Sequence, residues 1–179
     1  HDGTPVDAAA IKYNLERALT SGISRRKAEI SATKAVEAVD ATTVKISLKE
    51  PSVPLLAALS DRAGMIISPA AGAKLGDKFT DAPVCSGPYK FLERVIQDRI
   101  VLEKFPQYYD AAKYHFDRLI HRGMPDSNVR LLNLRSRQLD LIERLSATDV
   151  EAVKKDKALA VDPVIGLGYY GITFSIGGD

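Results

Sequence analysis

The feature of this sequence that constrains its fold most is a strict alternation of apolar and polar residues over Thr43–Lys49. Val44, Ile46 and Leu48 fall on one side of an extended chain and polar side chains on the other. This is the pattern of a half-buried β-strand. A weaker strand pattern over 34–40 precedes it, and a short polar turn separates the two. The two segments predict an antiparallel hairpin, so part of the chain must form a sheet with one covered face.

A second hairpin and several helices complete the predicted elements. Strand patterns over 89–96 and 99–105 flank the turn Gln97-Asp98. Asp7 is a good N-cap for a helix over 8–19, because its carboxylate can accept from unpaired amide groups. The other predicted helices are 55–59, 69–75, 128–136 and one opened by a capping box at 146–149 and running to 155; the other predicted strands are 65–67, 116–122, 139–143, 158–162 and 169–176. Strands and helices interleave without a strict strand–helix–strand rhythm, so the predicted fold class is mixed α/β.

The loop from Gly76 to Pro88 is the part of the chain richest in glycine, proline and aspartate. We place a domain boundary here, which divides the chain into residues 1–85 and 86–179. We interpret Cys85-Ser86-Gly87-Pro88-Tyr89, which leads into the second hairpin, as the crossing from one domain to the next. The chain opens on a polar turn and ends directly after a strand-like run, so we expect it to be a piece of a larger protein.

Composition excludes several classes of protein. The net charge of +2 is too small for a nucleic-acid groove, which needs a clustered basic face, and the densest basic stretch is only Arg25-Arg26-Lys27. The single cysteine excludes an internal disulfide. No apolar run approaches the roughly 18 residues of a membrane-spanning helix. We therefore expect a globular domain with no nucleic-acid partner.

No residue pattern points to catalysis, a cofactor or a metal. Phosphate-binding glycine loops, nucleophile elbows and paired cysteines are absent from the sequence. The three histidines lack the spacing of a zinc site. Cys85 could be a nucleophile beside a histidine, but a small buried thiol in a turn is the favoured interpretation. Carboxylate pairs such as Asp77/Asp81 and Asp140/Glu143 are common in a charged sequence. We expect a non-enzymatic protein without a cofactor.

Tyr169 and Tyr170 are the aromatic residues that best fit a binding role. Glycines flank them at positions 166, 168 and 171, and these would let a ligand or another backbone approach. In a strand the two rings point to opposite faces, so one can lie in the core while the other lines a cleft. The alternative, one core tyrosine and one edge tyrosine, stays open. The pair Tyr108-Tyr109 is interpreted as packing in a loop.

The order of several short motifs resembles the extracellular solute-binding proteins, family 5, which are binding components of ABC importers. The opening His1-Asp2-Gly3-Thr4-Pro5 with its capped helix is similar to that family's D-G-T-P opening, so Gly3 and Pro5 become motif residues. The other motifs that carry the resemblance are Val39–Pro51, Ser68-Pro69, Pro83–Tyr89, Pro106–Tyr109, Pro125–Asp140 and Gly168–Phe174. Within them, the motif residues are Ser86, Gly87, Pro88, Tyr89 and Asp140. Each motif is common, but they follow one another at compatible spacings along essentially the whole chain.

The sequence departs from that family's pattern at a few turns. Cys85 stands where the pattern has Gly, and Ser86 where it has Thr. If the glycine position has a positive φ, Cys85 would be strained. Arg137 replaces the Gly that usually follows the short helix, which would cost about 1 kcal/mol. Gln138 and Ser175 are further departures.

The resemblance implies a periplasmic-binding-protein type II fold, truncated at both ends. Residues 1–85 would be part of the extra domain of peptide-type binding proteins, and residues 86–179 the central part of the first ligand-binding lobe. The implied function is to bind di- or oligopeptides in the periplasm or at the cell surface and to deliver them to the permease. Closure of two lobes around the solute would drive this, with the full-length protein a monomer.

Two alternatives remain open beside the peptide hypothesis. The same fold can bind another solute, such as a nickel chelate, haem, glutathione, an opine or an oligosaccharide, and fold alone does not choose among them. The fold can also serve as a sensor or scaffold domain that takes no part in transport. We expect the present segment by itself to bind no peptide measurably, because half of the cleft would be absent.

Overall fold

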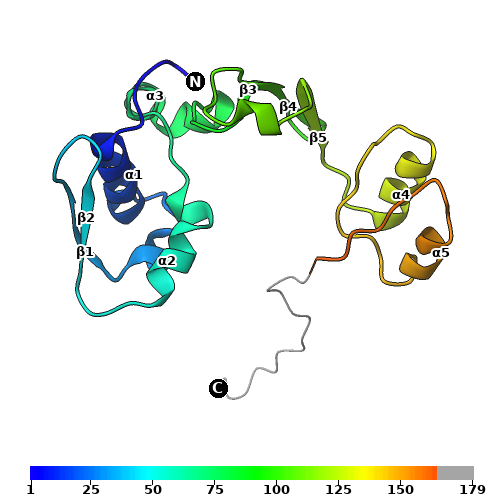
Figure 1. Ribbon diagram of the computed structural model, residues 1–179, viewed down its shortest axis with the longest axis horizontal. Helices are drawn as coiled ribbons and strands as arrows, with labels where there is room; N and C mark the ends of the chain where they lie inside the picture. Colours follow the sequence, from blue (N-terminus) through cyan, green and yellow to red (C-terminus); the bar gives the residue numbers. More distant parts are fainter. Residues whose placement is uncertain (165–179) are drawn as a thin grey trace, which may run out of the picture. The chain divides into compact units, whose positions relative to one another are not determined.

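The computed structural model describes residues 1–164 and divides the chain into two compact units, 1–123 and a second that begins at Met124. The first unit opens with helix α1 (Ala8–Thr20) (Figure 1). Asp7 accepts a hydrogen bond from the amide of Ala10 at 2.9 Å, which satisfies one of the unpaired donors at the helix start. The helix and its N-cap confirm the expectation from the sequence.

The first hairpin consists of β1 (Thr33–Ala38) and β2 (Val44–Leu48), paired antiparallel. Asp40 shapes the turn, because its carboxylate accepts from the amides of Thr42 and Thr43, both at 2.8 Å. The chain continues through α2 (Pro54–Leu59), α3 (Pro69–Leu75) and short 3₁₀ turns at Lys27–Ile30, Arg62–Gly64 and Gly76–Asp81. Both α2 and α3 carry proline in the first turn, where its missing amide costs nothing.

A small core joins these elements. Its buried members come from α1, the first 3₁₀ turn, β1, α2 and the second 3₁₀ turn, and they are Leu15, Ile30, Val36, Leu55 and Ala63. The alternating apolar residues of β2 pack against this cluster, as the sequence pattern predicts. The hairpin therefore closes one side of a core that α1 crosses.

The second sheet has three antiparallel strands in the order β3 (Tyr89–Val95), β4 (Arg99–Lys104) and β5 (Arg118–Arg122). The predicted hairpin and its turn are confirmed. The turn spans the three residues 96–98, and Gln97 within it has a left-handed φ of 62°. The register shifts between Phe91 and Glu93, so β3 carries a bulge opposite β4.

The second unit, described to residue 164, holds α4 (Ser127–Arg135) and α5 (Val150–Lys154). Asp126 caps α4 by accepting from the amide of Val129 at 2.9 Å. The guanidinium of Arg130 donates to the carbonyls of Met124 at 2.6 Å, Pro125 at 2.7 Å and Arg144 at 3.0 Å. One side chain thus ties the segments before and after α4 together.

Arg137 follows α4 with a φ of 60°, a left-handed conformation, at the position where the resemblance expects a glycine. Its amide donates to Leu134 at 3.0 Å, and the amide of Gln138 donates to Asn133 at 2.9 Å. These two bonds form a Schellman motif, which normally has glycine at this place.

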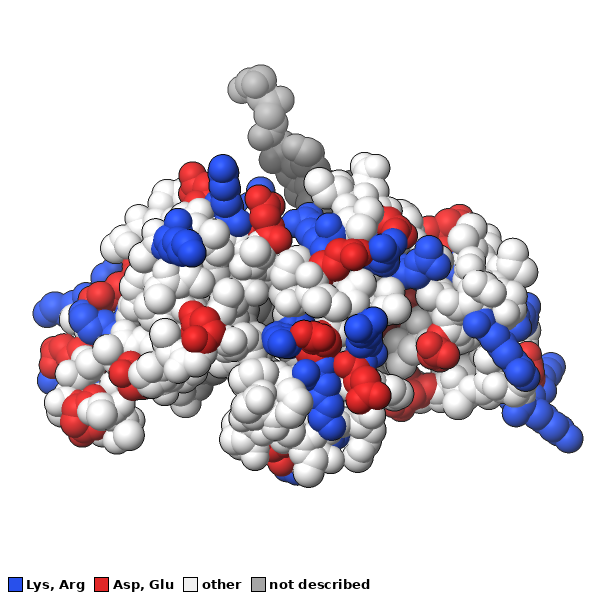
Figure 2. Space-filling model, turned by 90° about the horizontal axis from the view of Figure 1, so that it is seen from above, with Lys and Arg blue, Asp and Glu red and all other residues white. Residues whose placement is uncertain are grey.

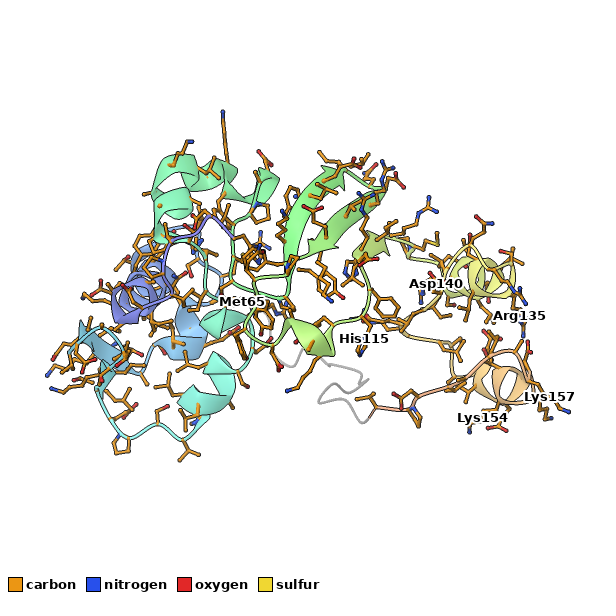
Figure 3. The ribbon with its side chains drawn as sticks, turned by 45° about the horizontal axis from the view of Figure 1, so that its top comes forward. Met65, His115, Arg135, Asp140, Lys154 and Lys157 are labelled. Carbon is orange, nitrogen blue, oxygen red and sulfur yellow. The ribbon has the colours of Figure 1, made fainter. Side chains whose placement is uncertain are left out.

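Replacing Arg137 with glycine is therefore expected to stabilise the protein by about 1 kcal/mol, because glycine adopts the left-handed region without steric cost. Urea denaturation should show a higher midpoint at an unchanged slope. Arg135→Gly is the matched control, since Arg135 is the last residue of α4 (Figure 3), has no positive φ and should be destabilised by the same change. Equal effects of both substitutions would contradict the explanation.

Four predicted elements differ from the structure. Residues 65–67 are no buried strand: only Ile67 forms an isolated antiparallel bridge, to Cys85, and Met65 is 68% exposed. Residues 139–143 and 158–162 are not strands, and no neighbouring strand lies within the described part of the second unit to pair with them. The capping box at 146–149 does not form, because Ser146 bonds to Thr148 instead and Asp149 begins α5 without a side-chain cap. The predicted strand 169–176 lies outside the described residues.

No helix of the described chain is long and apolar enough to cross a membrane. On the face in Figure 2, Lys and Arg side chains alternate with Asp and Glu side chains. Ion pairs within the described residues include Lys90–Glu103 at 2.8 Å and Arg99–Glu93 at 2.7 Å. A broad basic patch is absent from that face, in line with the small net charge.

Candidate functional site

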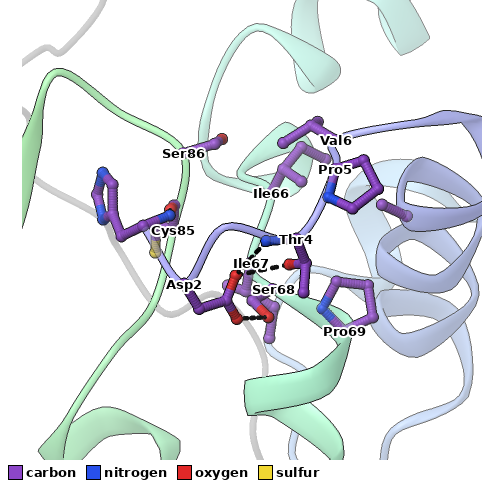
Figure 4. A pocket seen from close by; sticks show the side chains of 12 residues that line it. Asp2, Thr4, Pro5, Val6, Ile66, Ile67, Ser68, Pro69, Cys85 and Ser86 are labelled. Carbon is purple, nitrogen blue, oxygen red and sulfur yellow. Dashed lines mark hydrogen bonds between the residues drawn. The ribbon is translucent and has the colours of Figure 1, made fainter. Parts of the chain in front are cut away.

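Three of the motif segments that lie far apart in the sequence meet around one hollow in the first unit. Its lining comes from the opening turn with the start of α1, from the residues that enter α3 and from the crossing before β3, and consists of His1, Asp2, Thr4, Pro5, Val6, Ala10, Ile66, Ile67, Ser68, Pro69, Cys85 and Ser86 (Figure 4). The empty space is about 260 Å³, part of it open to solvent. Pockets for small molecules usually start at about 300 Å³. The hollow is therefore a junction of the backbone rather than a peptide cleft.

Asp2 is the polar centre of this junction (Figure 4). It accepts from the hydroxyl of Ser68 and from both the hydroxyl and the amide of Thr4, at 2.6 and 3.0 Å. Ser68 is almost fully buried and also caps α3, because its hydroxyl oxygen accepts from the amide of Ala71 at 3.1 Å. The Ser68 hydroxyl, followed by the two Thr4 donors, lowers the pKa of Asp2 to about 2.

The low pKa of Asp2 predicts a dependence of stability on pH. The folded-state pKa lies below the ordinary 3.8, so the ionised carboxylate stabilises the fold above pH 3.8 and this contribution is lost as the pH falls towards 2. Asp2→Asn should remove that part of the pH dependence and cost less than about 1 kcal/mol at pH 7, because Asp2 is exposed and screened by solvent. Urea midpoints between pH 2 and 7 measure it. A wild-type slope in the variant would contradict the assignment.

Two segments cross at the base of the hollow as a short stretch of sheet. Ile67 and Cys85 form an antiparallel bridge, and the amide of Ser68 donates to the carbonyl of Val84 at 2.9 Å. Cys85 has no positive φ, so the strain that its replacement of glycine suggested is absent. Burial raises the pKa of its thiol, which keeps the thiol protonated and disfavours a nucleophilic role.

The first residue links the crossing to the sheet β3–β5. The backbone nitrogen of His1 donates to the carbonyl of Cys85 at 2.9 Å, and its ring nitrogen Nε2 lies 2.8 Å from the carbonyl of Gly87. The His1 ring also packs edge-on against Phe105, with centroids 4.9 Å apart. The opening turn therefore contacts both α3 and the sheet.

The remaining motif residues occupy defined places. Gly3 has a φ of 81° in the opening turn, a conformation that favours glycine. The carbonyl of Pro88 accepts from the amide of Phe105 at 2.8 Å. Asp140, labelled in Figure 3, is exposed and lies in a loop of the second unit. Tyr169 and Tyr170, the predicted ligand-binding residues, lie outside the described residues.

An aromatic cluster lies beside the crossing. Tyr89 and Tyr108 each contact Tyr114 edge-on, with centroids 5.9 and 5.6 Å apart, and Tyr108 stacks at a tilt on Tyr109 at 4.5 Å. The neighbouring Tyr109 raises the pKa of Tyr108 to about 12. This agrees with the interpretation of the Tyr108-Tyr109 pair as packing in a loop.

No group of three or more His, Cys, Asp or Glu side chains that could hold a metal ion occurs within residues 1–164. His115, labelled in Figure 3, is exposed. Two polar residues that organise the structure were missed in the sequence, Asn14 in α1 and Arg130 in α4. Both bond to backbone carbonyls of distant segments, and no sequence motif marks such partners.

Comparison with known proteins gives the family. Residues 1–177 match the family described as bacterial extracellular solute-binding proteins, family 5 middle. The chain is 33% identical over 164 residues to the glutathione-binding protein GsiB of Pectobacterium atrosepticum, covering 90% of this chain and 32% of the relative. It is 31% identical to GsiB of Escherichia coli K12, covering 87% of this chain and 31% of the relative.

Comparison with solved structures agrees with this family assignment. The binding protein AgaA in complex with agropinic acid, from A. tumefaciens R10, has a TM-score of 0.82 and 34% identity, covering 88% of this chain and 32% of that one. NikZ from Campylobacter jejuni in complex with Ni(L-His) has a TM-score of 0.75 over 88% of this chain and 32% of that one, and at 24% identity supports the fold alone. The chain therefore spans about a third of its relatives and holds part of a periplasmic-binding-protein type II fold. It belongs to the bacterial extracellular solute-binding proteins, family 5.

Proposed function

We propose that this chain is part of the substrate-binding component of an ABC importer, which takes up a peptide or peptide-like solute outside the cytoplasm and presents it to a membrane permease. The observation that carries the proposal is the match to family 5 over residues 1–177. Glutathione is itself a tripeptide, and the relatives named for binding it are 31–33% identical to this chain. The proposed role is binding, without catalysis.

An opine is the second candidate solute. The agropinic-acid complex has both the higher identity and the higher TM-score of the two structures compared above. Agropinic acid and glutathione both carry carboxylates, so one binding site could favour either through basic side chains.

A panel of solutes tested on the full-length protein decides between these candidates. We expect thermal stabilisation and calorimetric binding with glutathione or with short peptides. A ligand at 100 times its Kd adds about 2.7 kcal/mol to the free energy of unfolding. Agropinic acid and Ni(L-His) are tested in parallel as the alternative solutes. A response to neither glutathione nor any di- to pentapeptide would overturn the peptide proposal, and a response to agropinic acid alone would assign an opine.

The placement of the site is also a proposal. We assign residues 1–85 to the extra domain of peptide-type binding proteins, residues 86–179 to the first lobe, and Tyr169 or Tyr170 to the cleft. Tyr169→Ala and Tyr170→Ala in the full-length protein test this, because only the tyrosine that contacts solute should weaken binding while the other lowers stability. Tyr109→Ala is a suitable control, since Tyr109 is 90% exposed in the first unit.

A further inference from the structure

Asn14 uses its side-chain amide to bond both backbone groups of a residue in a distant segment. It lies in α1, and its side chain is 5% exposed. Its Oδ1 accepts from the amide of Ile67 at 3.0 Å, and its Nδ2 donates to the carbonyl of Ile67 at 2.9 Å. The same Nδ2 also donates to the carbonyl of Ala10 at 2.9 Å, one turn earlier in the helix. The amide therefore satisfies both backbone groups of a residue that lies 53 positions away.

The bonds to Ile67 reproduce those of a neighbouring antiparallel strand. In a hydrogen-bonded pair of such strands, one residue exchanges an N–H and a C=O with the residue opposite. Successive residues of a strand direct these groups to opposite edges. Ile67 directs its groups to Asn14, while Ser68 donates to Val84 on the other edge. The side chain of Asn14 thus occupies the place of a strand next to the segment 66–68.

The Asn14 side chain in the place of a strand extends a short ladder of backbone hydrogen bonds across the junction. The segment 66–68 bridges to Cys85, and the carbonyl of Cys85 accepts from His1 on its far edge. Two residues beyond Gly87 the chain enters β3 at Tyr89, which pairs with Lys104 of β4. The ladder consequently runs from the Asn14 amide through 66–68 and 84–86 to His1, and joins α1 to the start of the sheet.

We propose that Asn14 is the positioning residue of this crossing: its side-chain amide acts as the first strand of the ladder and fixes β3–β5 relative to α1. Few other contacts join the two parts. Elements of the α1 region contact one another, and the strands β3–β5 contact one another, but no element pair linking the two groups makes an extensive contact among the described residues. Removing the side-chain amide of Asn14 should make the orientation of β3–β5 relative to α1 more variable without unfolding either part.

Hydrogen exchange at single residues of the full-length protein tests whether Asn14 holds the backbone of Ile67. Asn14→Leu keeps the size of the side chain but leaves the Ile67 amide without its acceptor. We expect its exchange to become roughly 10- to 100-fold faster, because a buried donor loses its partner. Asn133→Leu is the matched control, since among the described contacts the Asn133 side chain bonds only within α4, to the carbonyl of Val129 at 2.8 Å. Unchanged exchange at Ile67 in Asn14→Leu would overturn the proposal.

A distance measurement tests the second step. Spin labels are attached to cysteines introduced at Thr20 of α1 and Arg118 of β5, both exposed, after Cys85 is replaced by Ala so that it takes no label. The distance between the labels reports the orientation of the sheet relative to α1. Asn14→Leu should broaden the distance distribution, and Asn133→Leu should leave it unchanged. Asn14→Ser serves if the leucine variant does not fold, because serine can still bond to its own helix but cannot reach Ile67. A distribution as narrow as the wild type in both Asn14 variants would show that the ladder is no positioning device. Neither measurement depends on which solute binds.

Discussion

Gly64→Ala is expected to destabilise the protein by about 3 kcal/mol, at the upper end of what overpacking usually costs. A Cβ at this position would lie 1.9 Å from the carbonyl oxygen of Leu59 and 2.8 Å from its carbonyl carbon. Both are backbone atoms, so no side-chain rotation can relieve the clash. The amide of Gly64 also donates to Asp61 at 3.0 Å, which holds the glycine in place. The turn Arg62–Gly64 would have to move away from α2.

The movement would reach the core, because Ala63 next to this glycine is 6% exposed and belongs to the buried cluster. Urea denaturation measures the effect as a lower midpoint. Gly22→Ala is the matched control: nothing lies within 4 Å of its would-be Cβ and its φ is not positive, so we expect a change within 0.5 kcal/mol. A Gly64→Ala variant as stable as Gly22→Ala would mean that α2 and the turn are not packed as the structure has them.

The sequence predicts best the elements whose pattern is decided by one covered face. Both hairpins and α1 are found where their periodicity places them, because burial of Val36 and Leu15 selects one side of each element. The cap at Asp7 was equally accessible, since it depends on residues close in the chain. The turn at Arg137 was expected only through the resemblance to the family, which has a glycine there.

The predicted elements that the structure contradicts are those that need a pairing partner far away in the sequence. Residues 139–143 have a strand-like composition, but a strand is stable only when another strand pairs with it. Leu141 is instead 75% exposed. Residues 65–67 do pair, with Cys85 on one edge and with the side chain of Asn14 on the other. A sequence pattern carries no information about a side chain that takes the place of a strand.

The junction shows the same limit for the candidate site. Asp2, Ser68 and Cys85 each stand in a recognisable motif, and their order along the chain indicates the family. That these motifs meet around one hollow follows only from the fold. Their contacts also change their interpretation, because Asp2 and Ser68 hold backbone segments together and the hollow, at about 260 Å³, is smaller than a usual small-molecule pocket. Motif residues here maintain the geometry of a crossing, and Tyr169 and Tyr170, the proposed solute contacts, are outside the described residues.

Ile30→Ala is expected to cost about 3–4 kcal/mol, within the range for removing most of a buried aliphatic side chain. Ile30 is 1% exposed and ends the 3₁₀ turn Lys27–Ile30, where it packs with Leu15, Val36 and Leu55. Because these partners come from three different elements, no single one can move in to fill the space. The cavity should therefore remain, and its loss of contacts adds to the lost burial of the methyl groups.

Two further substitutions separate burial from side-chain chemistry. Ile30→Val removes one methylene and should cost about 1 kcal/mol. Ile23→Ala makes the same chemical change as Ile30→Ala at a site that is 71% exposed, and should alter the free energy of unfolding by less than 0.5 kcal/mol. Urea midpoints of the three variants give the comparison. Since the Ile30 side chain is the common contact of α1, β1 and α2, a small effect of Ile30→Ala would mean that this core does not hold the first unit together.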